Sequence, residues 1–250
     1  MNVLTDLLLP RRCPCGDALD DDHLGRVASA VCRDCRRSLT GGPPLAARPY
    51  PRPAGLPACS AAAAYAGGIR RCVIAYKERG WRSLAPVLAL ALVKALGGLV
   101  PALGAAEPLL LVPVPASRAA LRSRGFDHVA LLVQSAVRLM PPVLRAQWSW
   151  SPLLYPVRRV ADQAGLPAAA RAHNVAGSLA LRPGQGRLVA ARASRLVLVD
   201  DVLTSGATLA EAARALRAGG LRTHNAVVVA AVVRPESAGS SALPSRGRSG

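Results

Sequence analysis

The sequence predicts an α/β protein in which helices cover both faces of a mostly parallel β-sheet, with a small cysteine-rich module in front of the sheet. Three observations support this prediction. Continuous aliphatic runs of strand length occupy residues 109–114, 196–199 and 226–233, as expected for strands that are buried on both faces. Helix-forming stretches separate these runs along the chain. Four of the six cysteines lie within the first 42 residues.

The cysteines of the N-terminal module form one Cys-x-Cys pair and one Cys-x-x-Cys pair: Cys13, Cys15, Cys32 and Cys35. In a reducing compartment, paired cysteines favour metal binding over disulfides, and four thiolates are a common ligand set for structural Zn²⁺. The first pair is one residue shorter than the usual knuckle, so either a tighter turn forms there or His23 or an acid supplies a ligand. Cys59 and Cys72 stand alone and are expected to be ordinary core or surface thiols.

Composition sets the expected domain boundaries. Residues 43–57 are rich in Pro and Gly, and they are expected to form a linker between the cysteine-rich module of residues 1–42 and a main domain of residues 58–234. The tail of residues 235–250 has almost no apolar content and is expected to be disordered.

Two segments between the aliphatic runs have the composition of helices. The apolar stretch 84–100 is interrupted by a proline, a lysine and two glycines, so we expect a buried amphipathic helix and no membrane span. Residues 209–217 favour a second helix, which Gly219 and Gly220 are expected to end. Residues 188–191 are expected to form a short strand or a loop.

Residues 141–171 are rich in Pro, Arg and Trp and show weak periodicity. They are expected to form a long excursion over the active-site edge of the sheet. Trp148 and Trp150 lie in this segment, where we expect them to anchor it through apolar contacts. The alternative is that they stack on a base or on single-stranded nucleic acid.

The net charge of +18 comes from 32 basic and 14 acidic residues, and nearly all the basic residues are arginine. An arginine bias together with abundant Ala, Gly and Pro is typical of a GC-rich genome, so part of this charge reflects the base composition of the gene and not the function of the protein. The rest favours anionic partners, either phosphorylated substrates or nucleic acid. The N-terminus lacks the small-residue cleavage site of a secretory signal, and a cytoplasmic protein without a membrane partner is expected.

Two adjacent acids, Asp200 and Asp201, directly follow the aliphatic run 196–199. The carboxyl ends of parallel strands are where open α/β sheets bind ligands, and paired carboxylates suit the vicinal diol of a ribose and a nearby Mg²⁺. The next loop leads into a helix N-terminus, which favours an anion such as a phosphate. Its residues are Thr204, Ser205, Gly206, Ala207 and Thr208. The simpler alternative is an acidic turn followed by an ordinary helix cap.

This segment resembles the 5-phosphoribosyl-pyrophosphate (PRPP) binding motif of type I phosphoribosyltransferases. Further blocks resemble, in the same order, the ComF/GntX family of phosphoribosyltransferase-like proteins: residues 65–71, 76–80, 113–115, 122–127, 163–166 and 171–177. With the cysteine pairs, the resemblance covers most of residues 7–233. It implies a type I phosphoribosyltransferase fold with a hood, a zinc-ribbon-like N-terminal module, and Mg²⁺ bound together with PRPP.

The resemblance also implies roles for individual residues. Asp200 and Asp201 would act in catalysis by holding the ribose hydroxyls, and the loop 204–208 would bind the 5′-phosphate. Ser117 and Arg118 would bind pyrophosphate, because a guanidinium group pairs well with phosphate oxygens. Lys77 is expected either to bind pyrophosphate or to pair with an acid such as Glu78, and His128 is expected to be structural.

The function implied is the transfer of ribose 5-phosphate from PRPP to an unidentified acceptor base, a pentosyl glycosyltransferase reaction of nucleotide metabolism. Thr204 stands where purine salvage enzymes carry a catalytic acid, so hypoxanthine and guanine are not expected as acceptors. One alternative is a non-catalytic, PRPP-responsive or single-stranded-DNA-handling protein associated with competence and DNA uptake. Another is a domain that keeps only the fold and binds pyrophosphate esters structurally. The oligomeric state is left open.

Overall fold

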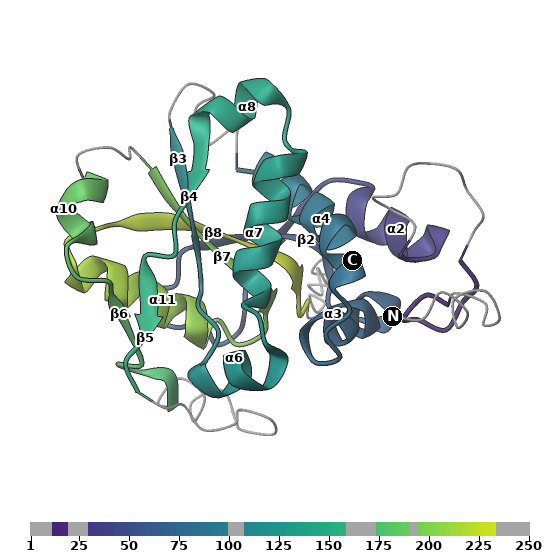
Figure 1. The fold of residues 1–250 in the computed structure, drawn as a ribbon, viewed down its shortest axis with the longest axis horizontal. Helices are drawn as coiled ribbons and strands as arrows, with labels where there is room; N and C mark the ends of the chain where they lie inside the picture. The colour runs from purple at the N-terminus through teal and green to yellow at the C-terminus, as the bar shows by residue number, and fades with distance from the viewer. Residues whose placement is uncertain (1–11, 20–29, 100–107, 159–173, 191–194, 234–250) are drawn as a thin grey trace, which may run out of the picture.

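The computed structural model describes residues 12–19, 30–99, 108–158, 174–190 and 195–233. Its central feature is a six-stranded sheet with the strand order β1-β2-β8-β7-β3-β4 (Figure 1). All neighbouring strands in this sheet are parallel except β1, which pairs antiparallel with β2 at one edge. The strands are β1 (Leu45–Ala47), β2 (Ala58–Ala64), β3 (Leu109–Pro113), β4 (Trp148–Trp150), β7 (Arg195–Leu203) and β8 (Thr223–Ala231). The predicted α/β fold with a mostly parallel sheet is confirmed.

Helices cover both faces of this sheet (Figure 1). On the first face, α4 and α7 pack against each other, α3 lies beside them, and α2 packs on α4. On the second face, α11 packs against β7 and β8 and contacts a separate two-stranded sheet made of β5 and β6. The bounds are α2 (Arg33–Thr40), α3 (Gly67–Lys77), α4 (Ala85–Gly97), α7 (His128–Leu139), α11 (Ala207–Ala218), β5 (Leu154–Pro156) and β6 (Leu179–Leu181).

The remaining described helices are short: η1 (Arg82–Leu84), α6 (Arg118–Arg124), α8 (Pro142–Gln147) and α10 (Gln185–Ala190). One apolar core lies on each face of the sheet, because the side chains of each strand alternate between its faces. In β7, Val197 and Val199 belong to the first core, which lies between the sheet and α3, α4 and α7. Leu196 and Leu198 belong to the second core, which lies between the sheet and α11.

The strands and helices predicted from the strongest patterns are present. The runs 109–114, 196–199 and 226–233 correspond to β3, β7 and β8, and the helices predicted over 84–100 and 209–217 correspond to α4 and α11. Helix α11 ends as expected from its two glycines. Gly220 has a φ of 82°, and the Leu221 N–H turns back to the carbonyl of Leu216 at 2.9 Å.

The expectation for residues 188–191 was wrong for the residues that the structure describes, because residues up to 190 belong to α10. Gly184 has a φ of 77° just before this helix begins, and Val189 is buried in the second core. A run of four residues is too short for its period to separate a strand from one turn of a helix.

The predicted excursion at 141–171 is not purely a loop. It begins with α8 and then supplies β4, an edge strand that pairs in parallel with β3. Trp148 is 7% exposed and belongs to the first core, so the apolar role expected for it is confirmed. A strand of three residues leaves no periodic signal, and its place in the sheet depends on this buried ring. Residues 159–171 lie outside the described residues.

Residues 43–57, the predicted linker, contain the edge strand β1, which is followed by Pro-rich chain that packs on the second core through Leu56. His23 and the predicted tail at 235–250 lie outside the described residues. None of the helices in the described part of the chain is long and apolar enough to span a membrane.

The carboxyl ends of β2, β8, β7 and β3 lie at one edge of the sheet. There the Tyr65 N–H donates to Ala231 O at 2.7 Å, and the Val114 N–H donates to Val199 O at 2.8 Å. The segments that leave these strands lead into α3, α6 and α11. This edge therefore brings the loop after β7 close to the start of the segment that contains Ser117 and Arg118.

Candidate functional site

The two adjacent acids of β7 have different surroundings, because successive side chains of a strand point to opposite faces. Asp201 lies on the same side of the strand as Val197 and Val199, and it contacts α3 and α7 on the first face of the sheet. Asp200 lines a small hollow of about 20 Å³ together with the loop that leads into α11. Of the two acids, only Asp200 lines this hollow.

Asp201 is 3% exposed and held by two basic side chains. Its Oδ2 lies 2.9 Å from Lys77 Nζ at the end of α3 and 3.2 Å from His128 Nε2 at the start of α7. Burial alone would raise the pKa of Asp201, but Lys77 and His128 hold it well below its ordinary value. Burial alone would lower the pKa of Lys77, but Asp201 and Asp200 raise it. Lys77 thus pairs with an acid, which was one of the two expectations, and that acid is Asp201 and not the neighbouring Glu78.

Asp200 is half-buried, and among the described residues no basic side chain forms an ion pair with it. Its Oδ1 accepts a hydrogen bond from the Asp201 N–H at 2.9 Å. Burial and the charge of Asp201 together raise the pKa of Asp200 well above its ordinary value. A cation or a hydroxyl donor in the hollow would therefore stabilise the ionised form of Asp200.

The loop after β7 supplies the other wall of the hollow. Thr204 is exposed, while Ser205 and Thr208 are half-buried. The Ser205 hydroxyl accepts a weak hydrogen bond from the Ala207 N–H at 3.5 Å, at the first turn of α11. The loop thus places hydroxyl groups and a helix N-terminus beside Asp200, a combination suited to an anion.

Gly206 is required here for two reasons. Its φ of 79° lies in the left-handed region, which disfavours side chains. In addition, a Cβ on Gly206 would lie 2.9 Å from Leu56 Cδ2, so the segment after β1 packs directly on this glycine. Gly206 can be identified from the sequence, but no local pattern connects Leu56 with the loop.

The segment after β3 reaches the same edge. Ser117 caps α6 by accepting from the Ala120 N–H at 3.2 Å, and both Ser117 and Arg118 are exposed. Asp127 holds this segment in place, because its Oδ2 accepts from the Ala116 N–H at 3.4 Å while its Oδ1 caps α7. Asp127 immediately precedes a helical stretch, where an Asp is a recognisable cap signal.

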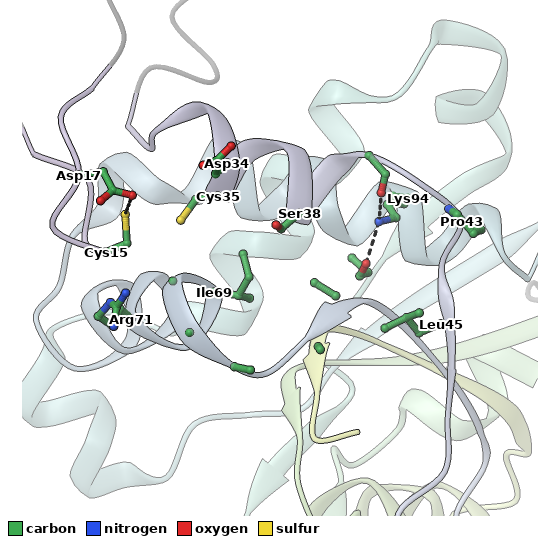
Figure 2. Close-up of a pocket in the computed structure, with 17 residues that line it drawn as sticks. Cys15, Asp17, Asp34, Cys35, Ser38, Pro43, Leu45, Ile69, Arg71 and Lys94 are labelled. Carbon is green, nitrogen blue, oxygen red and sulfur yellow. Dashed lines mark hydrogen bonds between the residues drawn. The ribbon is translucent and has the colours of Figure 1, made fainter. Parts of the chain in front are cut away.

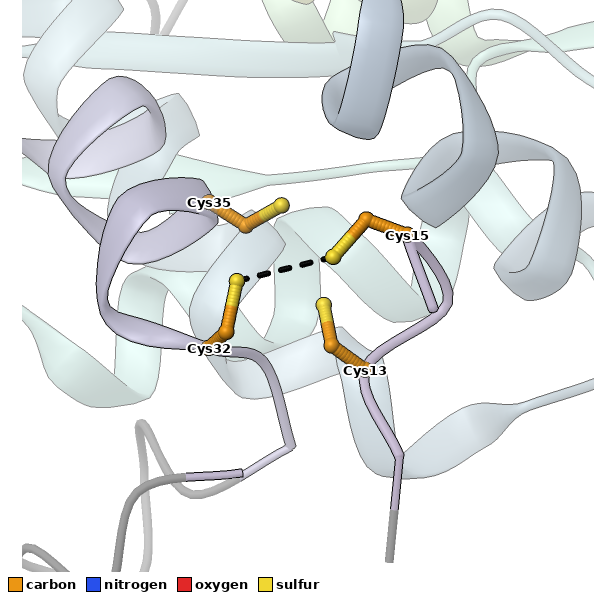
Figure 3. A group of neighbouring side chains, drawn as sticks. All are labelled: Cys13, Cys15, Cys32 and Cys35. Carbon is orange, nitrogen blue, oxygen red and sulfur yellow. Dashed lines mark hydrogen bonds between the residues drawn. The ribbon is translucent and has the colours of Figure 1, made fainter. Parts of the chain in front are cut away.

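The four predicted metal ligands lie together at the N-terminal module (Figure 3). Their sulfur atoms all lie within 4.8 Å of one another, and Cys15 Sγ lies 3.5 Å from Cys32 Sγ. Tetrahedral Zn²⁺ with Zn–S bonds of about 2.3 Å places its sulfurs about 3.8 Å apart. The cluster is therefore close enough to hold a metal ion such as zinc.

Each cysteine pair is presented by a different local structure. The short Cys-x-Cys pair forms the tighter turn that was one of the expected alternatives: the Gly16 N–H donates to Cys13 O at 2.8 Å, and Gly16 has a φ of 103°. Cys32 is the N-cap residue of α2, and Cys35 lies in its first turn. A helix N-terminus favours thiolates, so this placement suits metal ligation.

Two further residues belong to the surroundings of the cluster. Cys72 of α3 is fully buried and donates to Cys13, which lowers the pKa of Cys13 below its ordinary value. Cys72 was expected to be an ordinary core or surface thiol, and it is a buried core thiol, which the packing of α3 against the module places beside Cys13. Gly68 is also close, since a Cβ there would lie 2.6 Å from Cys35 Sγ.

An open hollow of about 580 Å³ lies beside the cysteine cluster, between α2, α3 and the strands β1 and β2 (Figure 2). Its walls are mainly small apolar residues, with Asp34 and Arg71 at the surface. Lys94 closes one end, where its Nζ donates to Ala62 O at 2.8 Å and to the carbonyl of Gly41. Lys94 thereby ties α4 to β2 and to the chain after α2.

Comparison of this chain with protein-family models and with curated proteins found no match.

Proposed function

We propose that this protein binds PRPP together with Mg²⁺ and is a phosphoribosyltransferase-like protein of the ComF kind, which transfers ribose 5-phosphate to an acceptor base. One observation carries the proposal: Asp200 and residues 204–208 line the same hollow at the carboxyl end of a buried parallel strand. A carboxylate beside a helix N-terminus suits a ligand that carries a hydroxyl-bearing ring next to a phosphate.

The phosphate half of this site would be the loop and the first turn of α11. Helix α11 has 12 residues, and the first N–H groups of a helix have no partner within the helix. Its dipole favours negative charge at this end. The exposed hydroxyl of Thr204 and the half-buried hydroxyl of Thr208 would donate further hydrogen bonds to a 5′-phosphate.

The ribose half would be Asp200. A carboxylate with a raised pKa is stabilised by a nearby cation or hydroxyl donor, so the chemistry of Asp200 fits a ribose hydroxyl and Mg²⁺. Bound with PRPP, Mg²⁺ would neutralise the charge of the pyrophosphate. We expect Asp201 to act through Lys77, which it holds at the edge of the site at 2.9 Å.

The pyrophosphate would be bound by Ser117 and Arg118, with Lys77 nearby. Ser117 and Arg118 are exposed at the edge where β3 ends, next to the end of β7. In the described part of the chain, no ion pair occupies the guanidinium group of Arg118, which leaves it available for phosphate oxygens. The protein would then act by positioning PRPP and stabilising the charge of the departing pyrophosphate.

The arrangement of the sheet supports a type I phosphoribosyltransferase fold as part of this proposal. A parallel sheet with helices on both faces carries the site at its carboxyl edge, and β5 and β6 form a separate small sheet beside α11. We assign the hood to the region around these two strands. We further propose that the cysteine cluster binds a structural Zn²⁺, on the basis of its sulfur spacing.

The proposal is tested by calorimetric titration of the full chain with PRPP in the presence of Mg²⁺. We expect wild type to bind and Asp200→Asn to bind at least about tenfold more weakly, because hydrogen bonds to a charged group contribute about 1.5–3 kcal/mol. Asp34→Asn is the matched control, since Asp34 is an exposed acid on α2 that does not line the site hollow. Wild-type protein that does not bind PRPP would contradict the proposal.

Catalysis requires a second measurement. Pyrophosphate release is followed with PRPP and a panel of nucleobases, and release that depends on one base identifies the acceptor. A parallel titration with single-stranded DNA tests the non-catalytic alternative. Binding of DNA that is unaffected by Asp200→Asn, without PRPP binding, would favour that alternative.

A further inference from the structure

Five polar side chains from four elements form a continuous chain of contacts behind the candidate site. Glu78 binds Arg124 Nη2 at 3.1 and 3.2 Å, and Arg124 Nη1 lies 3.4 Å from His128 Nδ1. His128 Nε2 lies 3.2 Å from Asp201 Oδ2, which also binds Lys77 Nζ at 2.9 Å. Because Lys77 and Glu78 are neighbours in the sequence, the chain of contacts closes into a ring.

His128 is the middle residue of this ring, and only one arrangement of its ring proton fits both of its neighbours. A guanidinium group only donates hydrogen bonds, so His128 Nδ1 must accept from Arg124. The proton of the neutral imidazole is then on Nε2, where it is donated to Asp201. His128 thus requires one acceptor atom and one donor atom, each facing a different partner.

The position of His128 is strongly constrained. Its side chain is 5% exposed, and its backbone carbonyl accepts from the Tyr76 hydroxyl at 2.7 Å. Asp127, the residue before it, caps α7. Burial of an imidazole without hydrogen-bond partners would cost free energy. The contacts with Arg124 and Asp201 offset this cost.

The ring connects the parts that the proposed function requires. Arg124 ends α6, the helix that begins at Arg118, and Lys77 ends α3. Asp201 belongs to β7, next to Asp200. His128 lies between these elements and is the link between Arg124 and Asp201.

We propose that His128 is a positioning residue of the candidate site, which holds Asp201 against Lys77 and fixes α6 relative to β7. This inference rests on the proposed function for its effect on PRPP, but the contacts themselves do not. His128 touches no substrate in this proposal. It acts through Asp201 and Lys77, which determine where the ammonium group lies at the edge of the site.

The test uses the small number of lysines in the chain. Lys77 and Lys94 are the only two lysines in the sequence, so full-length protein labelled with ¹⁵N-lysine has two side-chain ammonium signals apart from the main chain. Lys77→Arg assigns them. We expect His128→Leu to shift or broaden the Lys77 signal and leave the Lys94 signal in place, because Lys94 binds carbonyls elsewhere. His128→Gln supplies one donor and one acceptor, and it should keep the wild-type Lys77 signal.

The same variants are titrated with PRPP and Mg²⁺. His128→Leu should bind about tenfold more weakly than wild type, whereas His128→Gln should remain within about threefold. If His128→Leu does not fold, Arg124→Gln removes the neighbouring link of the ring and should perturb the Lys77 signal in its place. An unchanged Lys77 signal in the folded variant, or equal effects of Leu and Gln, would overturn the role of His128. Wild-type protein that fails to bind PRPP would refute the proposed function, while the lysine spectra would still decide the role of His128.

Discussion

At the scale of single residues, Asp200 and Asp201 show how one position in a strand changes the role of a carboxylate. Asp201 is buried against Lys77 and His128, which favour its ionised form. Asp200 faces the loop hollow, where burial and the neighbouring charge disfavour its ionised form. In the proposed function Asp200 binds the ligand, and a binding acid that is unfavourable in the free protein is a common compromise between stability and activity.

Substitution of these two acids is expected to change stability in opposite directions. Asp200→Asn should increase the free energy of unfolding at neutral pH. The pKa of Asp200 is raised in the folded state, so ionisation of this carboxyl group destabilises the fold as the pH rises above the ordinary pKa of 3.8. Asp201→Asn should decrease the free energy of unfolding by about 3 kcal/mol, the lower end for a buried ion pair, because Lys77 loses its partner and is itself 33% exposed. The contribution of Asp201 is present above its ordinary pKa and is lost as pH falls through the lower pKa of the folded state.

Urea denaturation of the two variants and wild type measures these differences at neutral pH. The advantage of Asp200→Asn should shrink as the pH approaches 3.8, where the carboxyl group becomes protonated in both states. Two variants that are destabilised alike at neutral pH would contradict the assignment of opposite environments.

At the scale of elements, α3 connects the cysteine cluster with the candidate site. It is 11 residues long, and its first turn carries Gly68 against Cys35 and Cys15. Cys72 contacts the cluster from the middle of the helix, and Lys77 ends it at Asp201. Helix α3 therefore links the position of the cysteine cluster to the position of Lys77 at one side of the site.

Gly68→Ala is expected to weaken metal binding by the cluster. The added Cβ would lie 2.6 Å from Cys35 Sγ and 3.2 Å from Cys15 Cβ, so at least one ligand must move. Gly97→Ala is the matched control, because this glycine ends α4 and a Cβ there meets nothing within 4 Å. Zinc release to a colorimetric chelator measures the effect, and equal release from both variants would show that Gly68 does not shape the cluster.

At the scale of the whole molecule, the cysteine cluster is part of the main core. Cys13, Cys32, Cys35 and Leu39 of the module belong to the same apolar cluster as α3, α4 and α7. Helix α2 packs on α4, and Lys94 of α4 binds the chain that follows α2. A metal in this cluster would therefore stabilise more than the module alone.

Removal of bound metal is expected to lower the melting temperature of the chain in a single transition, by on the order of 10 °C. Calorimetry with and without chelator measures this change, and added Zn²⁺ should reverse it. Cys32→Ser should behave like the chelated protein, whereas Cys59→Ser, which changes a cysteine of the other core, should keep the metal. Two separate transitions, with only the smaller one sensitive to chelator, would show that the module unfolds independently.

Features that are encoded in contiguous residues could be predicted from the amino-acid sequence alone. The buried strand, the acidic pair, the loop and the helix of residues 195–218 follow one another, so periodicity, propensity and cap signals were sufficient to predict β7 and α11. The same holds for α4 and for the grouping of the four cysteines, whose spacing restricts them to two short segments. The roles of these residues toward PRPP and Mg²⁺ stay predictions.

Contacts between side chains that are distant in the sequence depend on the three-dimensional packing. His128 and Asp201 are separated by 73 residues, and no local pattern joins them. The same is true of Lys77 with Asp201, of Leu56 on Gly206 and of Cys72 beside Cys13. Propensity and periodicity act over a few residues, whereas these contacts depend on how helices pack on the sheet. The acidic pair was therefore visible in the sequence, but the different surroundings of its two carboxylates were set by packing.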